Sequence, residues 1–114
     1  MNDDCLFCKI IAGDVPCDKV YEDETTLAFR DVHPMAKVHV LVVPKEHYAN
    51  VAQVAQSDPV LAAHMLQVAQ RIADAEYNGS FRLVCNTGED AGQSVFHAHM
   101  HVLTGQRCSQ EVAF

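Results

Sequence analysis

The sequence predicts an α+β fold with a mainly antiparallel sheet of five strands, and three observations support that prediction. Most segments rich in β-branched residues are short and bounded by turn residues, as strands are. The early ones are joined by connections of hairpin length, and one long amphipathic segment stands among the later ones. With 114 residues, of which 49% are hydrophobic, residues 1–114 suit a single globular domain.

The first part of the chain predicts a short helix and three strands. Residues 5–12 combine apolar and polar positions as an amphipathic helical turn does. Residues 19–22 and 26–30 are predicted to form two short strands of a hairpin-like pair. The valine-rich segment 37–43 ends before a proline and is the strongest strand signal in the chain.

The second part predicts the long helix and two further strands. Asp58 or Ser57 can cap a helix over residues 59–77, because Pro59 suits the first helical position and apolar residues recur at helical spacing. The remaining predicted segments are a short helix over 47–56, a strand over 80–86, a polar loop over 87–94 and a last strand over 95–103.

Charge and hydropathy exclude several classes of function. The net charge of -7 argues against a protein that reads the nucleic-acid backbone or docks on anionic lipid. No apolar run approaches the roughly 18 residues of a membrane span, and residues 1–4 lack the basic region of a signal peptide. We therefore expect a soluble cytoplasmic protein with no nucleic-acid partner and no membrane association.

The five cysteines do not indicate a disulfide framework, because their number is odd and no secretion signal is present. Cys5 and Cys8 form a C-x-x-C pair, which could be redox-active or bind a metal. Cys85 lies inside an apolar run and is expected to be a small core residue.

Three histidines, His97, His99 and His101, alternate with other residues inside the last predicted strand. Residues i, i+2 and i+4 of a strand point to one face, so the three imidazoles would stand in a row, with neighbouring Cα atoms about 6.6–6.8 Å apart. An incidental cluster, a three-histidine metal site and a catalytic row with a histidine nucleophile all fit this pattern. We expect His33 and His64 to be solvated and to have no role.

The loop before the histidines contains a glycine, an amide and a hydroxyl, at Gly92, Gln93 and Ser94. Glycine allows backbone N–H groups to approach an anion closely, and serine adds a hydroxyl donor. By itself such a loop is an ordinary turn. Beside the histidines it suggests a binding site for a phosphate-sized oxyanion.

At this point the sequence resembles the histidine triad (HIT) hydrolases. Residues 97–103 match the family signature, and the residues just before it, 92–95, are similar to the Hint branch. Weaker upstream similarities occur in the family's order, at residues 7–11, 21–23, 28–31, 34–36 and 39–45. The resemblance implies a HIT-like fold, with sheets joined across a homodimer.

The resemblance also implies a purine nucleotide hydrolase that cleaves at the α-phosphate of nucleoside phosphoramidates. His99 would form a nucleotidyl-histidine intermediate, with His97 and His101 as the other triad members. Ser94 would bind the phosphoryl oxygens or the leaving atom, and His39 could relay a proton. Three alternatives stay open: a dinucleotide polyphosphate hydrolase, a nucleotide-binding regulatory module with little turnover, and a zinc hydrolase that uses the row as ligands.

Family positions suggest how the nucleotide would bind. Asp31 would hydrogen-bond the ribose hydroxyls, and Asn86 would contact ribose or phosphate. The backbone of Gly92 and Gln93 would bind the phosphoryl oxygens. Apolar side chains would line the base pocket, although a core role suits them equally: Phe7, Leu6, Ile10, Phe29 and Val32.

Some bacterial family members bind zinc through a C-x-x-C pair, a histidine after Pro-Lys and the first triad histidine. The matching residues here are Cys5, Cys8, His47 and His97. Two cysteines and two histidines form a closed tetrahedral set without an open position, which indicates a structural zinc. No organic cofactor is expected.

Overall fold

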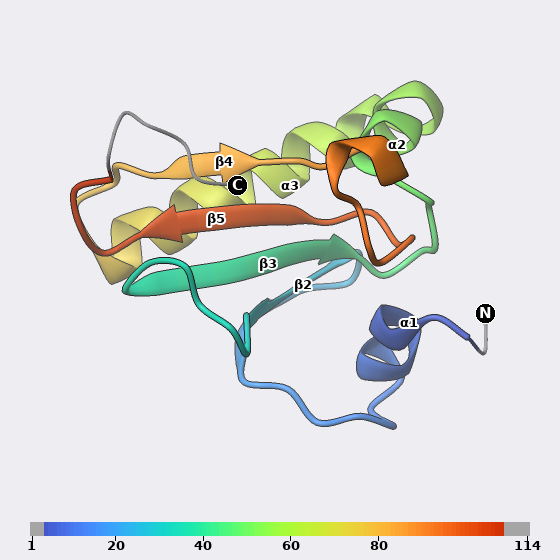
Figure 1. The fold of residues 1–114 in the computed structure, drawn as a ribbon, viewed down its shortest axis with the longest axis horizontal. Helices are drawn as coiled ribbons and strands as arrows, with labels where there is room; N and C mark the ends of the chain where they lie inside the picture. Colours follow the sequence, from blue (N-terminus) through green and yellow to red (C-terminus); the bar gives the residue numbers. More distant parts are fainter. Residues whose placement is uncertain (1–3, 109–114) are drawn as a thin grey trace.

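The computed structural model describes residues 4–108, which form a five-stranded antiparallel sheet with three helices (Figure 1). The sheet order is β1-β2-β3-β5-β4, and every neighbouring pair is antiparallel. The strands are β1 (Lys19–Glu22), β2 (Thr26–Arg30), β3 (Val38–Pro44), β4 (Arg82–Val84) and β5 (Met100–Thr104). The helices are α1 (Leu6–Ile11), α2 (Val51–Ser57) and α3 (Pro59–Glu76), with a 3₁₀ turn, η1, at Glu89–Ala91. The α+β prediction is confirmed.

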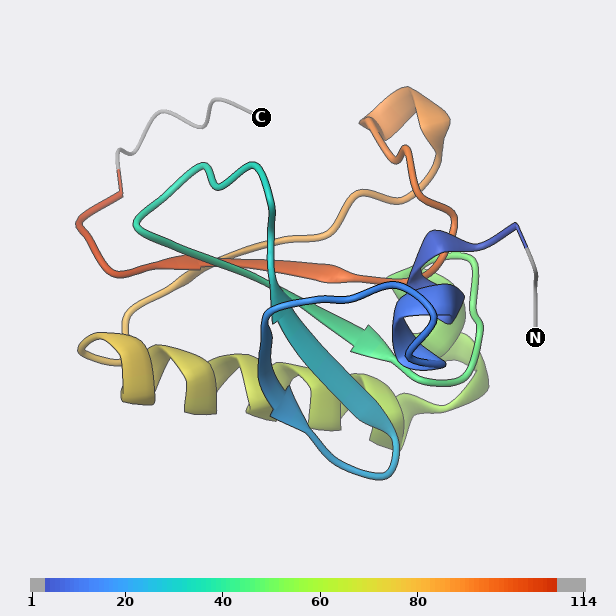
Figure 2. The same ribbon diagram turned by 90° about the horizontal axis from the view of Figure 1, so that it is seen from below.

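The long helix α3 covers one face of the sheet, as Figure 2 shows. Its predicted start is confirmed, because the Asp58 side chain accepts a hydrogen bond from the backbone N–H of Leu61 and Pro59 is the first helical residue. The apolar stripe of α3 packs on alternate residues of the central strands, and the buried members of this core include Met65, Val68, Val40, Val42, Met100 and Val102. Among residues 4–108, no helix is long and apolar enough to cross a membrane.

The short helix α1 covers part of the opposite face. Phe7, Cys5 and Cys8 pack with the outward-facing residues of β2 and β3, including Phe29 and Leu41. The sheet is therefore buried on both sides near α1, and β2 and β3 lose the polar alternation of a half-exposed strand. This packing holds α1 against the strands that carry the histidines.

The predicted last strand was too long. Regular pairing in β5 begins at Met100 opposite Val42, so His97 and His99 precede the ladder. The backbone N–H of Ala98 donates instead to the carbonyl of Tyr48, 2.7 Å away. The chain leaves the sheet there because β3 itself ends at Pro44, which has no N–H to offer a partner strand.

The other predicted elements are confirmed with shifted ends, at 82–84 for the fourth strand and 51–57 for the short helix. The predicted loop over 87–94 contains the 3₁₀ turn η1. The expectation for Cys85 was wrong, because its side chain is exposed. It directly follows the three-residue strand β4, where the chain has already left the core.

Candidate active site

The three histidines of the signature form a contiguous row although only His101 belongs to β5. The ring of Phe7 stands edge-on to His97 and His99, with centroid distances of 5.9 and 5.2 Å. The rings of His99 and His101 are 5.0 Å apart. The predicted row is thus present, held by α1 on one side and the sheet on the other.

His99 is 8% exposed, and a hydrogen bond to one of its ring nitrogens determines its tautomer. Its Nδ1 lies 2.7 Å from the carbonyl oxygen of His97. A carbonyl can only accept, so Nδ1 carries the proton and Nε2 carries a lone pair. Burial lowers the pKa of His99, which keeps the ring neutral at neutral pH. A neutral imidazole with a free lone pair is the form that can act as a nucleophile.

His39 and His101 are linked by a hydrogen bond whose direction is set by the backbone. The N–H of Met35 donates to Nδ1 of His39 over 3.0 Å, so the proton of His39 must sit on Nε2. That Nε2–H donates to Nδ1 of His101 over 2.9 Å, which leaves the His101 proton on its own Nε2. Asp31 lies beside the pair, with Oδ2 3.5 Å from Nε2 of His39. We call Asp31, His39 and His101 the relay cluster.

Protonation of the relay cluster is unfavourable. Burial lowers the pKa of His101 to about 4, and the neighbouring rings of His99 and His39 act in the same direction. Burial also lowers the pKa of His39, while the carboxylate of Asp31 opposes that shift. Both rings are therefore neutral at neutral pH, and each can accept or donate a proton in turn.

Two histidines of the row, His99 and His101, line a cavity of about 310 Å³, whereas His97 does not. Eight of the predicted site residues line it: Phe7, Asp31, His39, Asn86, Gly92, Ser94, His99 and His101. Sequence reasoning missed five more, His33, Met35, Leu41, Val84 and Val95. His33 could have been found from its spacing, because an aspartate often accepts a hydrogen bond from the backbone N–H two residues later. Here the His33 N–H donates to Asp31 Oδ1 over 2.8 Å, and the resulting turn places His33 at the cavity.

Four predicted base-pocket residues do not line this cavity. Val32 is 85% exposed, and Phe29 is buried with its ring 5.5 Å from that of Phe7. Ile10 packs against the core under α1. Leu6 lies at a neighbouring cavity. In this structure these residues pack in the core, are exposed to solvent or lie at another cavity. Their contact with a base stays a prediction.

The glycine loop is closed by its own hydrogen bonds. The backbone N–H of Gly92 donates to Glu89, and that of Gln93 donates to Gly88. The buried Gln93 side chain accepts from the Gly88 N–H and donates to the carbonyls of Ala49 and Val95. In this structure both amides are engaged within the loop, and their contact with the phosphoryl oxygens stays a prediction. Ser94 lines the cavity.

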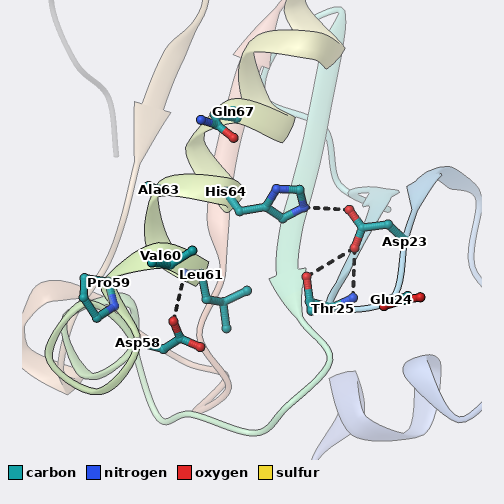
Figure 3. A pocket seen from close by; sticks show the side chains of 10 residues that line it. All are labelled: Asp23, Glu24, Thr25, Asp58, Pro59, Val60, Leu61, Ala63, His64 and Gln67. Carbon is teal, nitrogen blue, oxygen red and sulfur yellow. Dashed lines mark hydrogen bonds and ion pairs between the residues drawn. The ribbon is translucent and has the colours of Figure 1, made fainter.

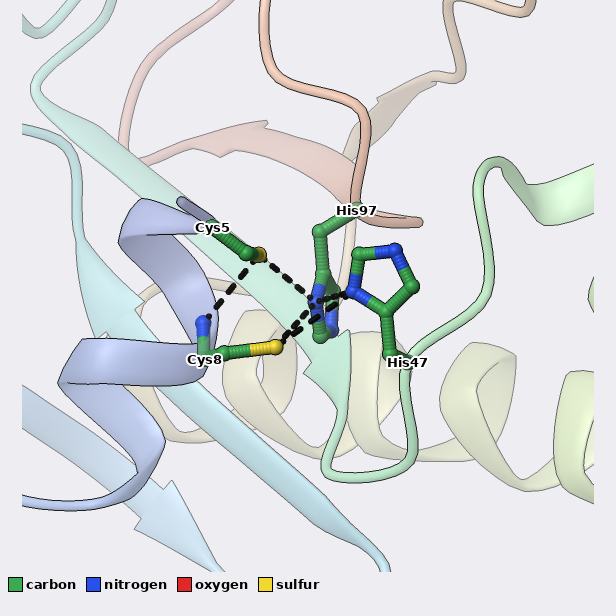
Figure 4. Close-up of side chains that lie close together, drawn as sticks. All are labelled: Cys5, Cys8, His47 and His97. Carbon is green, nitrogen blue, oxygen red and sulfur yellow. Dashed lines mark hydrogen bonds between the residues drawn. The ribbon is translucent and has the colours of Figure 1, made fainter. Parts of the chain in front are cut away.

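The first histidine of the row belongs to a second cluster, with Cys5, Cys8 and His47 (Figure 4). Nδ1 of His97 lies 3.3 Å from Cys5 Sγ, 3.5 Å from Cys8 Sγ and 3.1 Å from His47 Nδ1. All four ligand atoms lie within 4.8 Å of one another. We call these four residues the metal cluster, because they could bind a metal ion.

The backbone prepares the metal cluster for ligation. Nε2 of His97 lies 2.8 Å from the carbonyl of Pro44, so that nitrogen carries the proton and Nδ1 points its lone pair at the cysteines. The backbone N–H of Cys8 donates to Cys5 Sγ over 3.3 Å and holds that sulfur in place beside His97. Both cysteines and His97 are buried. Two sulfurs and two ring nitrogens gathered in this way suit a closed, structural site.

Another cavity, of about 730 Å³, lies between the β1–β2 turn and the start of α3 (Figure 3), and no histidine of the row lines it. His64 faces it, and its Nε2 lies 2.6 Å from Asp23 Oδ2, which also accepts the Tyr21 hydroxyl. Burial raises the pKa of Asp23, but hydrogen bonds from Tyr21, Thr25 and His64 lower it further, and the net shift is downward. The expectation of a solvated His64 was wrong, because it ties α3 to the turn.

Comparison with known proteins agrees with the fold and the row. A family model described as "Scavenger mRNA decapping enzyme C-term binding" matches residues 4–112. The chain is 44% identical over 107 residues to an uncharacterised HIT-like protein from Synechococcus elongatus, which covers 93% of this chain and 94% of the relative. It is 38% identical over 102 residues to protein HitA from Neisseria gonorrhoeae, which covers 89% of this chain and 95% of the relative.

Solved structures give the same result. A HIT family hydrolase from Clostridium thermocellum superposes with a TM-score of 0.91 at 37% identity, over 99% of this chain and 100% of that one. A histidine triad protein from Clostridium difficile superposes with a TM-score of 0.89 at 38% identity, over 98% and 99% of the two chains. Because sequence and fold both match over nearly the whole chain, this protein belongs to the histidine triad (HIT) family of hydrolases.

Proposed function

We propose that the protein hydrolyses purine nucleoside phosphoramidates of the AMP–amine type through a nucleotidyl-histidine intermediate on His99. The observation that supports this most strongly is the bond from His99 Nδ1 to the His97 carbonyl, which leaves a lone pair on Nε2. That ring lines a cavity that the Ser94 hydroxyl and all three residues of the relay cluster also line. We take residues 1–114 as one HIT domain of a cytoplasmic enzyme.

In the first step, Nε2 of His99 bonds to the α-phosphorus while the bond from phosphorus to the leaving nitrogen breaks. The leaving nitrogen takes up a proton and departs as the amine. The positive charge that develops on His99 is stabilised by its Nδ1–H bond to the His97 carbonyl, 2.7 Å away. Water then bonds to phosphorus and gives up one proton, which balances the proton taken up by the amine. The phosphorus–Nε2 bond breaks, and AMP leaves with the His99 lone pair restored.

The relay cluster supports both steps. His101 carries its proton on Nε2, where it can donate to a phosphoryl oxygen. His39 holds the other side of that ring and can pass a proton to it. Ser94 lines the same cavity and supplies a hydroxyl for the phosphoryl oxygens or the leaving nitrogen. Phosphoryl chemistry of this kind depends mainly on positioning and charge stabilisation.

Asp31 is our candidate for the ribose contact. Its Oδ1 accepts one backbone N–H, and each carboxylate oxygen has a further lone pair for a sugar hydroxyl. Asn86 lines the same cavity, and its Nδ2 donates to the Ala91 carbonyl, which leaves its side-chain oxygen for ribose or phosphate. These two residues would fix the nucleotide relative to His99.

Zinc is our candidate for the metal cluster, with a structural role. An ideal tetrahedral zinc site has nitrogen–nitrogen edges of about 3.4 Å and nitrogen–sulfur edges of about 3.6 Å, from bond lengths of about 2.05 and 2.3 Å. The corresponding separations here are 3.1 Å between the two histidine nitrogens and 3.3–3.5 Å from sulfur to nitrogen. The bound ion would tie α1 to the segment that carries His99.

We also propose that the protein is a homodimer whose sheets join across the interface. β4 is the last strand in the order of the sheet, so a second copy could extend the sheet along it. Light scattering of the purified protein measures this directly. A mass of twice the 12.6 kDa chain supports the dimer, and a mass of one chain contradicts it.

The test of the function is the initial rate of AMP release from adenosine 5′-phosphoramidate, for the parent protein and His99→Ala. We expect parent turnover and a loss of at least about a thousandfold in the variant, because the nucleophile is removed. AMP binding by both proteins, measured by calorimetry, controls for folding of the cavity.

The remaining outcomes separate the alternatives. A parent that binds AMP but hydrolyses no phosphoramidate contradicts the proposal and favours the regulatory module. If the protein cleaves a dinucleoside polyphosphate faster than any phosphoramidate, the result favours a dinucleotide polyphosphate hydrolase. Full activity in His99→Ala contradicts covalent catalysis on this residue.

A further inference from the structure

The metal cluster contains two cysteines whose spacing in the chain suits a second chemistry. Cys5 is the N-cap of α1 and Cys8 is the third residue of that helix, so the two lie one helical turn apart. Neither takes part in a disulfide in this structure. Residues one turn apart have Cα atoms about 5 Å from each other, and a disulfide spans about 4.4–6.8 Å between Cα atoms. The backbone therefore holds the pair at a distance that a disulfide can bridge.

The two sulfur atoms also point to the same place, beside the ring of His97 (Figure 4). Nδ1 of His97 lies 3.3 Å from Cys5 Sγ and 3.5 Å from Cys8 Sγ. The ligand atoms of the metal cluster all lie within 4.8 Å of one another, and this includes the two sulfurs. A disulfide bond is about 2.05 Å long, so its formation requires the sulfurs to approach by at most about 3 Å.

The residue type at the helix cap indicates that sulfur itself is used here. N-cap positions favour Ser, Thr, Asp and Asn, whose oxygen is a good acceptor for a backbone N–H, whereas a cysteine sulfur is a weak acceptor. Cys5 accepts the Cys8 N–H in this way, although a serine would cap α1 better. Metal ligation and disulfide formation both require the sulfurs, and they compete for the same two atoms.

The two cysteines differ in how a small oxidant would reach them. Cys5 lines a cavity of about 360 Å³ together with His47 and Ser94, whereas Cys8 does not line it. Cys8 is 3% exposed and packs in the apolar cluster between α1 and the sheet, with Phe7. A small oxidant in the cavity therefore meets the sulfur of Cys5 first, and the sulfur of Cys8 is the second to react.

We propose that Cys5 and Cys8 are a redox-sensitive pair, which a peroxide converts to a disulfide that no longer holds zinc. This inference goes beyond the proposed hydrolysis and rests only on the zinc assignment of the metal cluster. Once the sulfurs are bonded to each other, His47 and His97 are the donors of the cluster that remain. A structural zinc site needs four donors. Zinc binding and the disulfide therefore exclude each other, and bound zinc protects the pair from oxidation.

The oxidation consists of two balanced steps in the metal-free protein. The sulfur of Cys5 bonds to one oxygen of hydrogen peroxide, the O–O bond breaks, and the other oxygen leaves as water with the thiol proton. The sulfur of Cys8 then bonds to the sulfur of Cys5, and the sulfenic oxygen leaves as a second water with the proton of Cys8. Two thiols lose two electrons in total, and the peroxide takes them up.

The test treats metal-free and zinc-loaded protein with hydrogen peroxide and identifies disulfides by mass spectrometry of peptides. In the metal-free protein we expect a disulfide between Cys5 and Cys8 and the loss of two thiols. The oxidised protein should bind less than about a tenth of a zinc per chain, and dithiothreitol should restore binding of about one. The zinc-loaded protein should form the disulfide at least about tenfold more slowly.

Two variants test the roles of the cysteines. Cys8→Ser removes the second sulfur, so a sulfenic acid should accumulate on Cys5, where dimedone labels it. Cys85→Ser is the matched control, because Cys85 is exposed and outside the metal cluster. It should form the disulfide between Cys5 and Cys8 at the rate of the parent protein.

Two results would overturn the redox pair and leave the zinc assignment intact. One is oxidation of the exposed Cys85 while Cys5 and Cys8 remain thiols, and the other is a disulfide-bonded protein that still binds one zinc. A reduced protein that binds no zinc would overturn the zinc assignment and the exchange together. The proposed hydrolysis is tested separately, by the release of AMP.

Discussion

The metal cluster and the relay cluster contain the same kind of ring but differ in the backbone group that touches it. In the metal cluster, the Pro44 carbonyl accepts from Nε2 of His97 and turns its Nδ1 lone pair toward two sulfurs. In the relay cluster, the Met35 N–H occupies Nδ1 of His39 and forces the proton onto Nε2, between the two rings. One arrangement suits ligation of a metal, and the other suits transfer of a proton.

The difference teaches that proximity of ligand-type residues does not define a metal site. Asp31, His39 and His101 also bring their ligand atoms within 4.8 Å of one another. A metal there would need the lone pair of His39 Nε2, which carries a proton as long as Met35 donates to the other nitrogen. We therefore expect one bound zinc per chain, in the metal cluster.

The largest expected effect is on the metal cluster. Cys8→Ser removes a thiolate from the ligand set, so the zinc content should fall from about one per chain to near zero. The melting temperature should fall by about 10 °C or more, since a domain of this size shifts by about 4–8 °C per kcal/mol. Metal analysis and thermal melts measure both quantities.

Cys85→Ser is the matched control, because Cys85 is exposed and outside both clusters. It should leave the zinc content and the melting temperature unchanged. Zinc retained at full occupancy in Cys8→Ser would show that the metal binds elsewhere, with the relay cluster as the first place to look.

A smaller effect is expected in the relay cluster. His39→Phe removes the donor to His101, so kcat should fall about a hundredfold with little change in KM. His39→Gln keeps an N–H donor and should recover part of the loss. Both variants should bind zinc as the parent does. A rise in KM with kcat unchanged, or an equal fall of kcat in both variants, would contradict a relay and indicate a packing role.

The smallest effect concerns pH. The pKa of His101 is about 4 in the folded protein and close to 6.5 in an unfolded chain, so the unfolded state binds the proton first. The stability that this shift contributes is complete above pH 6.5 and is lost as the pH falls toward 4. Between pH 6.5 and 4, the free energy of unfolding measured in urea should fall more steeply for the parent than for His101→Asn. Parallel curves would contradict the lowered pKa.

Much of the fold was readable from local patterns. Pro59 and Asp58 set the start of α3, and the valines of β3 identify a strand buried on both faces. The histidine row was predicted correctly as a row but wrongly as a continuous strand. Its alignment comes partly from Phe7, 92 residues before His99 in the sequence, and no local pattern shows that contact.

The donor directions could not be predicted from the sequence. They depend on the Pro44 carbonyl, the Met35 N–H and the His97 carbonyl, which become neighbours of the rings only after folding. The engagement of Gln93 within its own loop and the pairing of His64 with Asp23 are of the same kind. A residue type indicates what a side chain can do, whereas its folded neighbours decide which of these it does.

The most direct test of the division between the two clusters is a chelator titration in which zinc content and AMP release from adenosine 5′-phosphoramidate are measured on the same samples. The measurement is made well below the melting temperature of the metal-free protein. We predict that turnover stays within about threefold of its starting value when zinc has been removed, because His99 and the relay cluster do the chemistry. Turnover that falls in proportion to the zinc lost, and returns when zinc is added back, would contradict the account.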